Sequence, residues 1–387
     1  MAEIGPRVFL DYDQAALDAA YDQAAYAPNR EQLIKRRERD SELVRQYIGE
    51  PERVAYGSAE IERLDIYRTA RAGAPVLIFI HGGAWRSGRS KDFAGPAEMF
   101  LAAGAHYVVP DFALVQDVGG NLMVLADQVC RAVAWVHRNA ARFGADPDRL
   151  YLGGQSSGAH LAAVALTTDW PREFGAPIEI VKGGICISGM YDLTPVSLSA
   201  RNRYVSFDDA AIAALSPIRH LDLLHAPLIV AYGTCETPEF QRQNREFAAA
   251  VEAAGKPVRL LVGEYYNHFE LPETLGNPYG LLGRAALDLM GLPPRAAQLN
   301  VPPLLVKKEE HFMALVTREL YSSANGDRWH LVRDGGRVFI RHQANLPSGG
   351  HVAEIEIGTF LSQGRGPEQQ ALLRLIGTLV GEPANGS

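Results

Sequence analysis

Short apolar runs alternate with helical patterns over much of the chain. The runs are rich in Val and Ile, are bounded by Gly, Pro or Asp, and comprise Pro75–Ile80, Ala105–Pro110, Leu150–Leu152, Gly183–Ile187 and Pro227–Tyr232. Runs of this kind are typical of strands buried on both faces of a sheet. Between them, residues 123–143 and 239–254 place apolar side chains at helical spacing. Strand alternating with helix over roughly 200 residues predicts a mostly parallel sheet with helices on both faces.

The segments on either side of this pattern differ from it. Residues 10–48 contain no glycine and place apolar residues at helical spacing around the break at 26–29, which predicts two or three surface helices. We expect residues 1–50 to form a helical cap segment and residues 51–291 to form the α/β catalytic domain. Helices of this kind can act as a lid over a pocket.

The C-terminal part of the chain has a pattern of its own. Residues 292–306 are rich in proline and predict a linker. After it come several runs with strand character, including a hairpin that would turn at Asp334-Gly335-Gly336, and an amphipathic helix, "PEQQALLRLIGTLV". These features predict a small α+β domain over 307–387. Its apolar alternation and its few catalytic-type residues favour an oligomerisation or interaction domain that is not part of the active site, and formation of a homo-oligomer is one form this role could take.

Composition narrows the class of protein. The 387 residues are 47% hydrophobic and 21% charged, which is typical of a globular protein with a large core. A formal net charge of −7, with no cluster of Lys and Arg, argues against nucleic-acid binding. No apolar stretch reaches the roughly 18 residues of a membrane helix, and no signal peptide is evident at the N-terminus. We expect a cytoplasmic protein with no membrane partner.

The sequence offers no metal or cofactor motif. Cys130, Cys186 and Cys235 are odd in number and widely spaced, which suits reduced thiols better than disulfides or a zinc site. No HExxH motif or EF-hand spacing occurs. We therefore expect no metal and no cofactor.

The stretch Gly154-Gln155-Ser156-Ser157-Gly158 fits a G-x-S-x-G turn between a strand and a helix. In such a turn the central serine is strained and exposed at the end of the strand, while small residues two positions away let the flanking backbones approach. Ser156 is then a candidate nucleophile. The alternative is a tight turn that only packs or binds a phosphate.

A serine nucleophile needs donors for the oxyanion and a base for its proton. The segment His81-Gly82-Gly83-Ala84-Trp85 follows a predicted strand, where backbone N–H groups can face the site together with the N–H of Ser157. An ordinary Gly-Gly turn is the alternative. His268 follows the run "VRLLVG" and is the candidate base, because the other histidines do not follow a late strand. His160, inside the helix after the turn, is a candidate only for shaping the pocket.

The acid that orients the base should follow the preceding strand. Glu236 lies a few residues after the run "PLIVAYG" and is the favoured candidate. Glu239 is the alternative, although its position after Pro238 suits an acid in the first turn of a helix.

Taken together, these motifs resemble the α/β-hydrolases of the arylformamidase (kynurenine formamidase) type, within the esterase/lipase superfamily. The resemblance covers about residues 10–290 and rests on seven segments in the family's order: "LDIYR", "HGGAW", "VVPDFAL", "GQSSGAH", "SGMYDL", "PEFQRQN" and "NHFE". It implies a Ser156–His268–Glu236 triad with an oxyanion hole formed by the amides of Gly82, Gly83 and Ser157.

Two positions depart from the family. The acid is Glu where animal formamidases have Asp, and Ser157 stands where Ala is common; both are compatible with the same chemistry but leave the substrate open. Residues 307–387 resemble only short bacterial proteins without an assigned function.

The expected function is that of a serine hydrolase that acts on a small ester or amide through an acyl-enzyme. An esterase acting on small acyl or aryl esters is favoured, and an arylformamidase that cleaves N-formylkynurenine-type amides is the alternative. A non-catalytic binding protein on the same fold is a second alternative. We expect an aromatic substrate pocket built from Trp85, Phe112, His81 and Tyr265, unless these rings pack in the core.

Overall fold

The computed structural model describes residues 5–294, 316–323, 325–334, 337–345, 351–364 and 366–378. The chain divides into two compact units, Met1–Leu299 and Asn300–Ser387. From residue 295 on, the predicted linker 292–306 lies outside the described residues.

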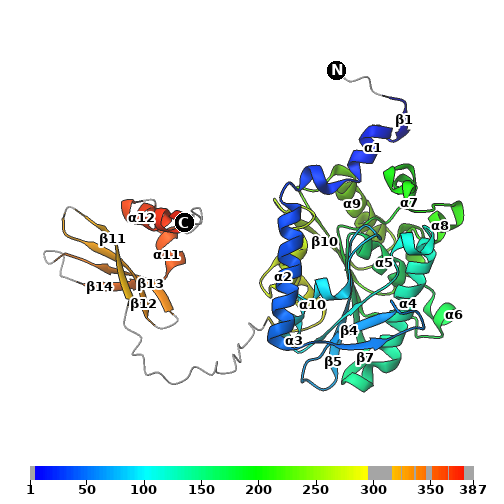
Figure 1. The fold of residues 1–387 in the computed structure, drawn as a ribbon, viewed down its shortest axis with the longest axis horizontal. Helices are drawn as coiled ribbons and strands as arrows, with labels where there is room; N and C mark the ends of the chain where they lie inside the picture. The colour runs from blue at the N-terminus through cyan, green and yellow to red at the C-terminus, as the bar shows by residue number, and fades with distance from the viewer. Residues whose placement is uncertain are drawn as a thin grey trace, which may run out of the picture. The chain divides into compact units, whose positions relative to one another are not determined.

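An eight-stranded sheet forms the centre of the first unit (Figure 1). Its strand order is β10-β9-β8-β7-β5-β6-β4-β3. The strands are β3 (Glu52–Ala55), β4 (Arg63–Tyr67), β5 (Ala74–Ile80), β6 (His106–Pro110), β7 (Ala145–Gln155), β8 (Gly183–Ile187), β9 (Leu228–Gly233) and β10 (Val258–Gly263). Neighbouring strands are parallel except where β4 pairs with β3 and with β6. The mostly parallel sheet predicted from the sequence is therefore confirmed.

Helices cover both faces of this sheet. Alternate residues of β5 point to opposite faces: Val76, Ile78 and Ile80 belong to one apolar cluster, and Leu77 and Phe79 to another. The first cluster includes side chains of α4 (Leu122–Asn139), α5 (Ser157–Leu166) and α9 (Pro238–Ala253). The second includes side chains of α3 (Ala97–Ala103) and α10 (Leu281–Leu289). Two buried layers explain why β5, β6, β8, β9 and the second half of β7 are mostly apolar.

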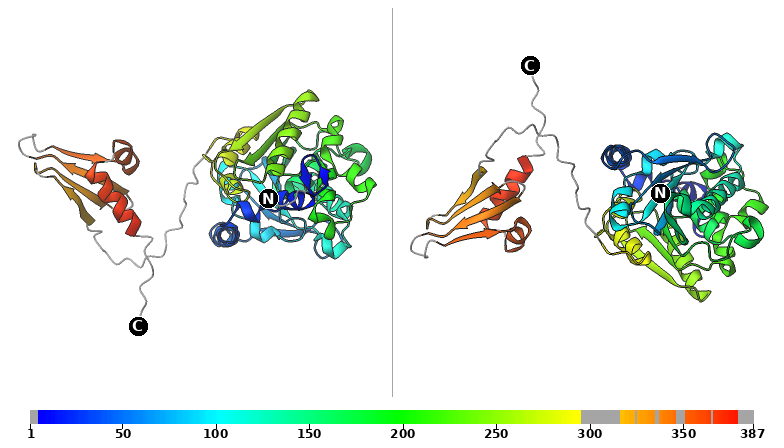
Figure 2. Two further views of the ribbon diagram at one scale, coloured as in Figure 1. Left: turned by 90° about the horizontal axis from the view of Figure 1, so that it is seen from above. Right: turned by 90° about the horizontal axis from the view of Figure 1, so that it is seen from below.

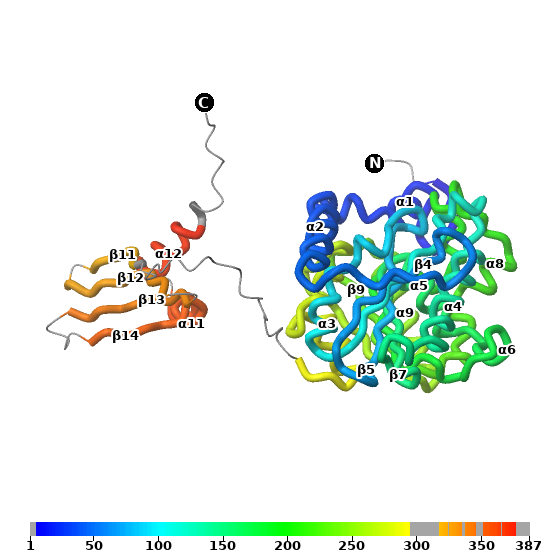
Figure 3. Tube along the Cα trace, turned by 60° about the horizontal axis from the view of Figure 1, so that its bottom comes forward, coloured from blue at the N-terminus to red at the C-terminus, as the bar shows by residue number. Residues whose placement is uncertain are grey.

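The N-terminal segment forms the predicted surface helices. These are α1 (Gln14–Ala20), a 3₁₀ turn η1 (Gln23–Tyr26) and the long α2 (Arg30–Ile48), preceded by a short pair of strands, β1 (Arg7–Phe9) and β2 (Tyr12–Asp13). Helix α2 runs along one side of the unit (Figure 3). It packs through Leu33 and Ser41, and the hydroxyl of Ser41 accepts a hydrogen bond from Gly95 N.

Short helices complete the first unit. They are α6 (Trp170–Phe174), α7 (Leu193–Leu198), α8 (Asp209–Ala214) and the 3₁₀ turns η2 (Ser90–Phe93), η3 (Val115–Val118), η4 (Ala140–Phe143), η5 (Ala200–Arg203), η6 (Pro217–Arg219), η7 (Leu221–Leu223) and η8 (Leu271–Gly276). No helix within the described part of the chain is long and apolar enough to cross a membrane.

The second unit is an antiparallel sheet with two helices. Its strands lie in the order β11 (Val316–Ser322), β12 (Arg328–Asp334), β13 (Arg337–Gln343) and β14 (Val352–Ile355). Helices α11 (Ile357–Ser362) and α12 (Pro367–Thr378) lie against the sheet (Figure 2), and Ile340, Phe360 and Leu372 form the core. Strands β12 and β13 pair as the predicted hairpin requires, although Gly335 and Gly336 lie outside the described residues.

Candidate active site

Ser156 lies on a sharp turn between β7 and α5. Its φ of 57° and ψ of −123° are strained for a residue with a side chain, and such strain is typical of functional turns. A Cβ atom added to Gly154 would lie 2.4 Å from the carbonyl oxygen of Gly158, and one added to Gly158 would lie 2.1 Å from that of Ile80. Only glycine fits at these two positions, which explains the glycines of the motif.

His268 contacts both of the other candidate catalytic side chains. Its Nε2 atom lies 2.9 Å from Ser156 Oγ, and its Nδ1 atom lies 2.8 Å from Glu236 Oε2. Because a carboxylate oxygen can only accept a hydrogen bond, Nδ1 carries the proton and Nε2 is free to accept the serine proton. The rings of Phe240 and Phe269 lie nearly perpendicular to the imidazole, with centroids 4.9 Å and 5.3 Å from its own.

Glu236 is completely buried and has three hydrogen-bond donors. Besides His268, the hydroxyl of Ser188 donates to Oε1 at 2.6 Å and the backbone N–H of Gly233 donates to Oε1 at 2.6 Å. Glu239, the alternative acid, accepts instead from Arg242 and from the hydroxyl of Tyr21. The geometry therefore brings Glu236, and not Glu239, to the histidine.

The loop after β5 lies beside the strained serine. A Cβ atom added to Gly82 would lie 3.3 Å from Ser156 Cβ, so the Gly82 backbone passes directly next to the serine. Gly83, Ala84 and Trp85 all have positive φ, which gives this loop a strained backbone. The N–H of Trp85 donates to Ser157 Oγ at 3.1 Å. The Ser157 hydroxyl therefore attaches the loop to the start of α5.

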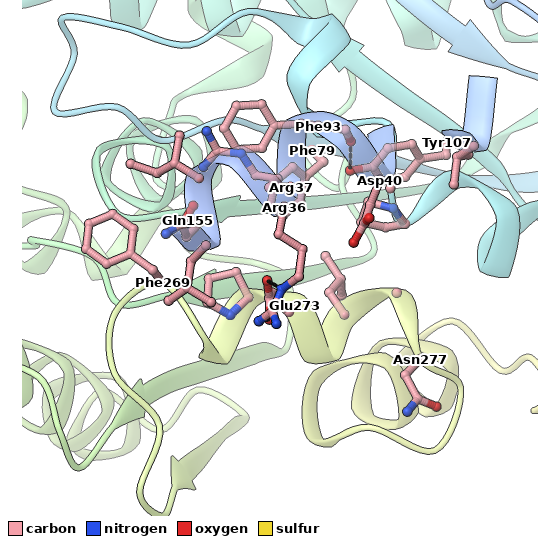
Figure 4. A pocket seen from close by; sticks show the side chains of 18 residues that line it. Arg36, Arg37, Asp40, Phe79, Phe93, Tyr107, Gln155, Phe269, Glu273 and Asn277 are labelled. Atoms are coloured by element: carbon pink, nitrogen blue, oxygen red, sulfur yellow. Dashed lines mark hydrogen bonds and ion pairs between the residues drawn. The ribbon is translucent and has the colours of Figure 1, made fainter. Parts of the chain in front are cut away.

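Ser156 and His268 line a surface hollow of about 920 Å³. Its wall comes from α1, η1, α2, the loop after β5 and the η5 region, and includes Tyr21, Arg37, Gly83, Arg201 and Phe269. A smaller cavity of about 310 Å³ lies beneath α2 (Figure 4). Four residues, Ile34, Arg37, Gln155 and Phe269, line both spaces. The smaller cavity is thus a neighbour of the reacting atoms.

The predicted aromatic pocket is not the one that the structure forms. Trp85 and Phe112 are each 2% exposed and pack in the core, where the Trp85 ring lies perpendicular to that of His160. His81 is stacked between Phe93 and Phe112. Tyr265 is 86% exposed and lines a separate surface depression. None of the four lines the hollow, because three rings are used for packing and the fourth faces solvent.

Sequence reasoning missed several side chains at this site. Ser188 has no motif of its own, and its contact with Glu236 depends on β8 and β9 being neighbours. Gln155, inside the motif, donates to the carbonyl oxygen of His268 at 3.2 Å and so joins the histidine loop to the turn. Arg37 and Arg201 come from segments where arginine is common, so the sequence carried no signal for them.

Burial suppresses ionisation of the groups behind the site. Desolvation lowers the pKa of His160 to about 4, although the carbonyl oxygen of Leu215 faces its ring at 2.8 Å. Desolvation also lowers the pKa of His81. It raises the pKa of the Cys130 and Cys186 thiols to about 12, so both stay protonated at neutral pH.

Comparison with known proteins identifies the class of protein to which this chain belongs. The BD-FAE family model matches residues 64–184. The fold resembles that of the esterase LipW from Mycobacterium marinum, with a TM-score of 0.55 and 18% identity over 70% of this chain and 90% of that one. It also resembles a thermophilic esterase from Thermogutta terrifontis, with a TM-score of 0.51 and 21% identity over 63% and 91% of the two chains. The fold and the relatives described next define an α/β-hydrolase of the esterase and arylformamidase type.

Two curated relatives identify the family within this class. Kynurenine formamidase of Danio rerio is 32% identical over 246 residues, which cover 62% of this chain and 81% of the relative. The esterase LipQ of Mycobacterium tuberculosis is 30% identical over 232 residues, 54% of this chain and 55% of the relative. The chain belongs to the kynurenine formamidase family, and it is a hydrolase of small ester or amide substrates.

Proposed function

We propose that the protein is a serine hydrolase that works through a Ser156–His268–Glu236 triad and an acyl-enzyme. The observation that carries the proposal is the continuous hydrogen-bonded chain from Ser156 Oγ through His268 to Glu236, at 2.9 Å and 2.8 Å. A non-catalytic binding protein would have no need of a strained serine joined to a buried acid.

The chemistry follows from the positions of these atoms. His268 Nε2 takes the proton of Ser156 Oγ as the oxygen attacks the substrate carbonyl, and Glu236 stabilises the imidazolium that forms. The N–H groups of Gly82, Gly83 and Ser157 hold the oxyanion. The imidazolium then protonates the leaving group, and water, activated by the same histidine, releases the acyl group and restores the serine.

Both esters and aryl formamides remain candidate substrates. We favour small acyl or aryl esters, and the match to the esterase LipQ supports that choice. The greater coverage of the kynurenine formamidase of Danio rerio supports the second candidate, a formamidase acting on N-formylkynurenine-type amides. A side-by-side assay of 4-nitrophenyl acyl esters and N-formylkynurenine compares kcat/KM for the two classes.

The test of the mechanism is the Ser156→Ala variant. Loss of the nucleophile should lower kcat by a factor on the order of 10⁴ to 10⁶, while the circular dichroism spectrum and the melting temperature stay near the wild-type values. Ser58→Ala, a change at an exposed serine away from the hollow, is the matched control and should keep full activity. Unchanged turnover in Ser156→Ala would falsify the proposal.

A further inference from the structure

Two side chains of the N-terminal segment form hydrogen bonds with the loops that carry His268 and Glu236. They are Asn29, at the start of α2, and Gln23, at the start of η1. Each contacts a residue directly beside a candidate catalytic side chain, although the partners lie 238 and 214 residues apart along the chain. The segment that forms part of the wall of the hollow therefore also supports the triad loops.

Asn29 forms a hydrogen-bonded ring with two residues that flank His268. Its Oδ1 accepts from Asn267 Nδ2 at 2.9 Å, and its Nδ2 donates to Glu270 Oε1 at 2.8 Å. Glu270 Oε2 accepts from Asn267 N at 3.0 Å, which closes the ring. Asn267 Oδ1 also accepts from the N–H groups of Phe269 and Glu270. Because Asn29 comes from outside the histidine loop, it fixes this loop relative to α2.

Thr237, the residue after Glu236, is held by the same segment. It is completely buried, and its hydroxyl donates to the carbonyl oxygen of Ala20 at 2.6 Å. The amide of Gln23 contacts it twice: Nε2 donates to the hydroxyl at 3.3 Å, and Oε1 accepts from the backbone N–H at 3.2 Å. The loop that carries the acid is therefore fixed relative to η1.

Asn29 and Thr237 use their side chains for these contacts and not for helix capping. They occupy the N-cap positions of α2 and α9, and neither makes the side-chain hydrogen bond that is typical of this position. Asp22, in the same segment, does cap its helix, because its carboxylate accepts from Ala24 N at 2.9 Å. Two side chains suited to stabilising a helix end instead join the segment to the triad loops.

We infer that Asn29 and Gln23 are positioning residues that keep His268 and Glu236 aligned with Ser156. The inference rests on the proposed function, because this alignment affects turnover only if a proton passes between Ser156 and His268. Each residue acts through the loop residue that it contacts. A displacement of about 1 Å at a reacting group can lower a rate by about a hundredfold, so loss of one of several loop contacts should have a smaller effect than that.

The first test replaces Asn29. Asn29→Leu keeps a branched side chain of similar length but removes both hydrogen bonds, and should lower kcat about tenfold. KM should stay within about twofold, because Asn29 is not part of the described wall of the hollow. Asn29→Asp keeps a good N-cap residue but places its carboxylate opposite that of Glu270, and should lower kcat at least as much. In Asn29→Asp/Glu270→Gln the amide at position 270 can donate to the carboxylate at position 29, so kcat should return to within about threefold of the wild-type value.

The second test replaces the residue beside the acid. Thr237→Val removes the hydroxyl with little change in volume and should lower kcat about tenfold, whereas Thr237→Ser keeps the hydroxyl and should stay within about twofold of the wild-type value. Gln23→Leu should lower kcat in the same way and should also change KM, because Gln23 lines the hollow.

Ser41→Ala is the matched control. It removes another hydrogen bond that joins α2 to the rest of the unit, from Gly95 N to a completely buried hydroxyl. Ser41 is not among the described residues that line the hollow or the smaller cavity, so kcat should be unchanged even where the melting temperature falls. A fall in kcat as large as in Asn29→Leu would show that any loosening of α2 lowers activity, and the inference would be wrong.

The proton between His268 and Glu236 gives a measurement that does not depend on turnover. A strongly hydrogen-bonded imidazole N–H gives a proton NMR signal far downfield, which Glu236→Gln should identify by altering it. This signal should shift or broaden in Asn29→Leu, return in Asn29→Asp/Glu270→Gln and stay unchanged in Ser41→Ala.

Together, the two measurements distinguish a failed inference from a failed function. An active wild-type protein in which Asn29→Leu and Thr237→Val change neither kcat nor the NMR signal would overturn the inference and leave the hydrolase proposal standing. A signal that depends on Asn29, in a protein that turns over no ester or formamide, would support the placement of His268 by Asn29 and contradict the proposed function.

Discussion

At the scale of single residues, the site depends on how Glu236 is held. This carboxylate is completely buried, and Ser188 and Gly233 fix one of its oxygens while His268 contacts the other. A buried carboxylate with fewer donors would be less stable in its charged form and less well oriented. Ser188 is therefore a positioning residue that acts through Glu236.

Ser188→Ala should lower kcat by about tenfold to a hundredfold, because one hydrogen bond to the buried charge is lost. KM should change much less, since Ser188 is not part of the wall of the hollow. The measurement is kcat and KM across pH, in which the acid limb of the kcat profile should also move. Ser216→Ala removes another completely buried hydroxyl, which bonds to the backbone of Ile212 and Leu193 and not to Glu236, and should leave that limb in place; a similar movement in both variants would contradict the assigned role.

The buried histidines make stability depend on pH. The folded pKa of His160, about 4, is below its unfolded value of about 6.5, so the unfolded chain binds more protons between these values. The stability from keeping His160 neutral is complete above about pH 6.5 and is lost as the pH falls toward 4, by at most about 1.4 kcal/mol per pH unit. His81 contributes in the same direction.

His160→Gln should lower the free energy of unfolding at pH 7.5, because it replaces a completely buried ring that packs against Trp85. Because glutamine does not titrate, the decline in stability toward pH 4.5 should be less steep than in the wild-type protein. The measurement is the free energy of unfolding by urea at several pH values in this window. A decline as steep in His160→Gln as in the wild-type protein would show that other groups cause the acid sensitivity.

At the scale of elements, the central strands were the most predictable part of the fold. Strands β5, β6, β8 and β9 and the part of β7 from Leu150 on are covered on both faces, so their sequences are mostly apolar and differ clearly from those of the helices. Strand β3 was missed because it is exposed at the edge of the sheet and reads "ERVA". The strained turn and the order of the three triad candidates were also visible, because they depend on spacing and on chain order.

The substrate pocket was not predictable in the same way. A sequence shows that Trp85 and Phe112 are aromatic and lie near strand ends, but it does not show which way they face. The structure turns both into the core, and α2 and η5 supply the wall of the hollow instead. Contacts between segments so far apart in the sequence depend on tertiary packing.

Helix α2 should set the size of the acyl group that the site accepts. Ile34 lines both the hollow and the adjoining cavity of about 310 Å³, so Ile34→Trp should fill part of this space. The ratio of kcat/KM for 4-nitrophenyl hexanoate to that for the acetate should fall by about tenfold. Leu43→Trp, at a position on the same helix that is 52% exposed, should leave the ratio unchanged. An unchanged ratio in Ile34→Trp would show that α2 does not select acyl groups by size.

At the scale of the whole molecule, the proposed chemistry belongs to one unit. Ser156, His268, Glu236 and the wall of the hollow all lie within Met1–Leu299. The second unit has its own small core of Ile340, Phe360 and Leu372. We propose that this unit serves in assembly of the protein rather than in catalysis.

A chain that ends at residue 299 should keep kcat/KM within about twofold of the full-length value. If the second unit joins copies of the chain, the mass measured by light scattering should fall to that of a monomer. Near-ultraviolet circular dichroism serves as the control for folding. Lost turnover in a truncated chain that is folded and has an unchanged oligomeric state would argue against a role limited to assembly.

The most direct test of the central claim is to find the residue that a serine-directed reagent modifies. After treatment with a fluorophosphonate, peptide mass spectrometry should locate the adduct on Ser156, and labelling should be lost in Ser156→Ala and strongly slowed in His268→Ala. An adduct on any other residue, or labelling that is equally fast without His268, would contradict the proposed triad.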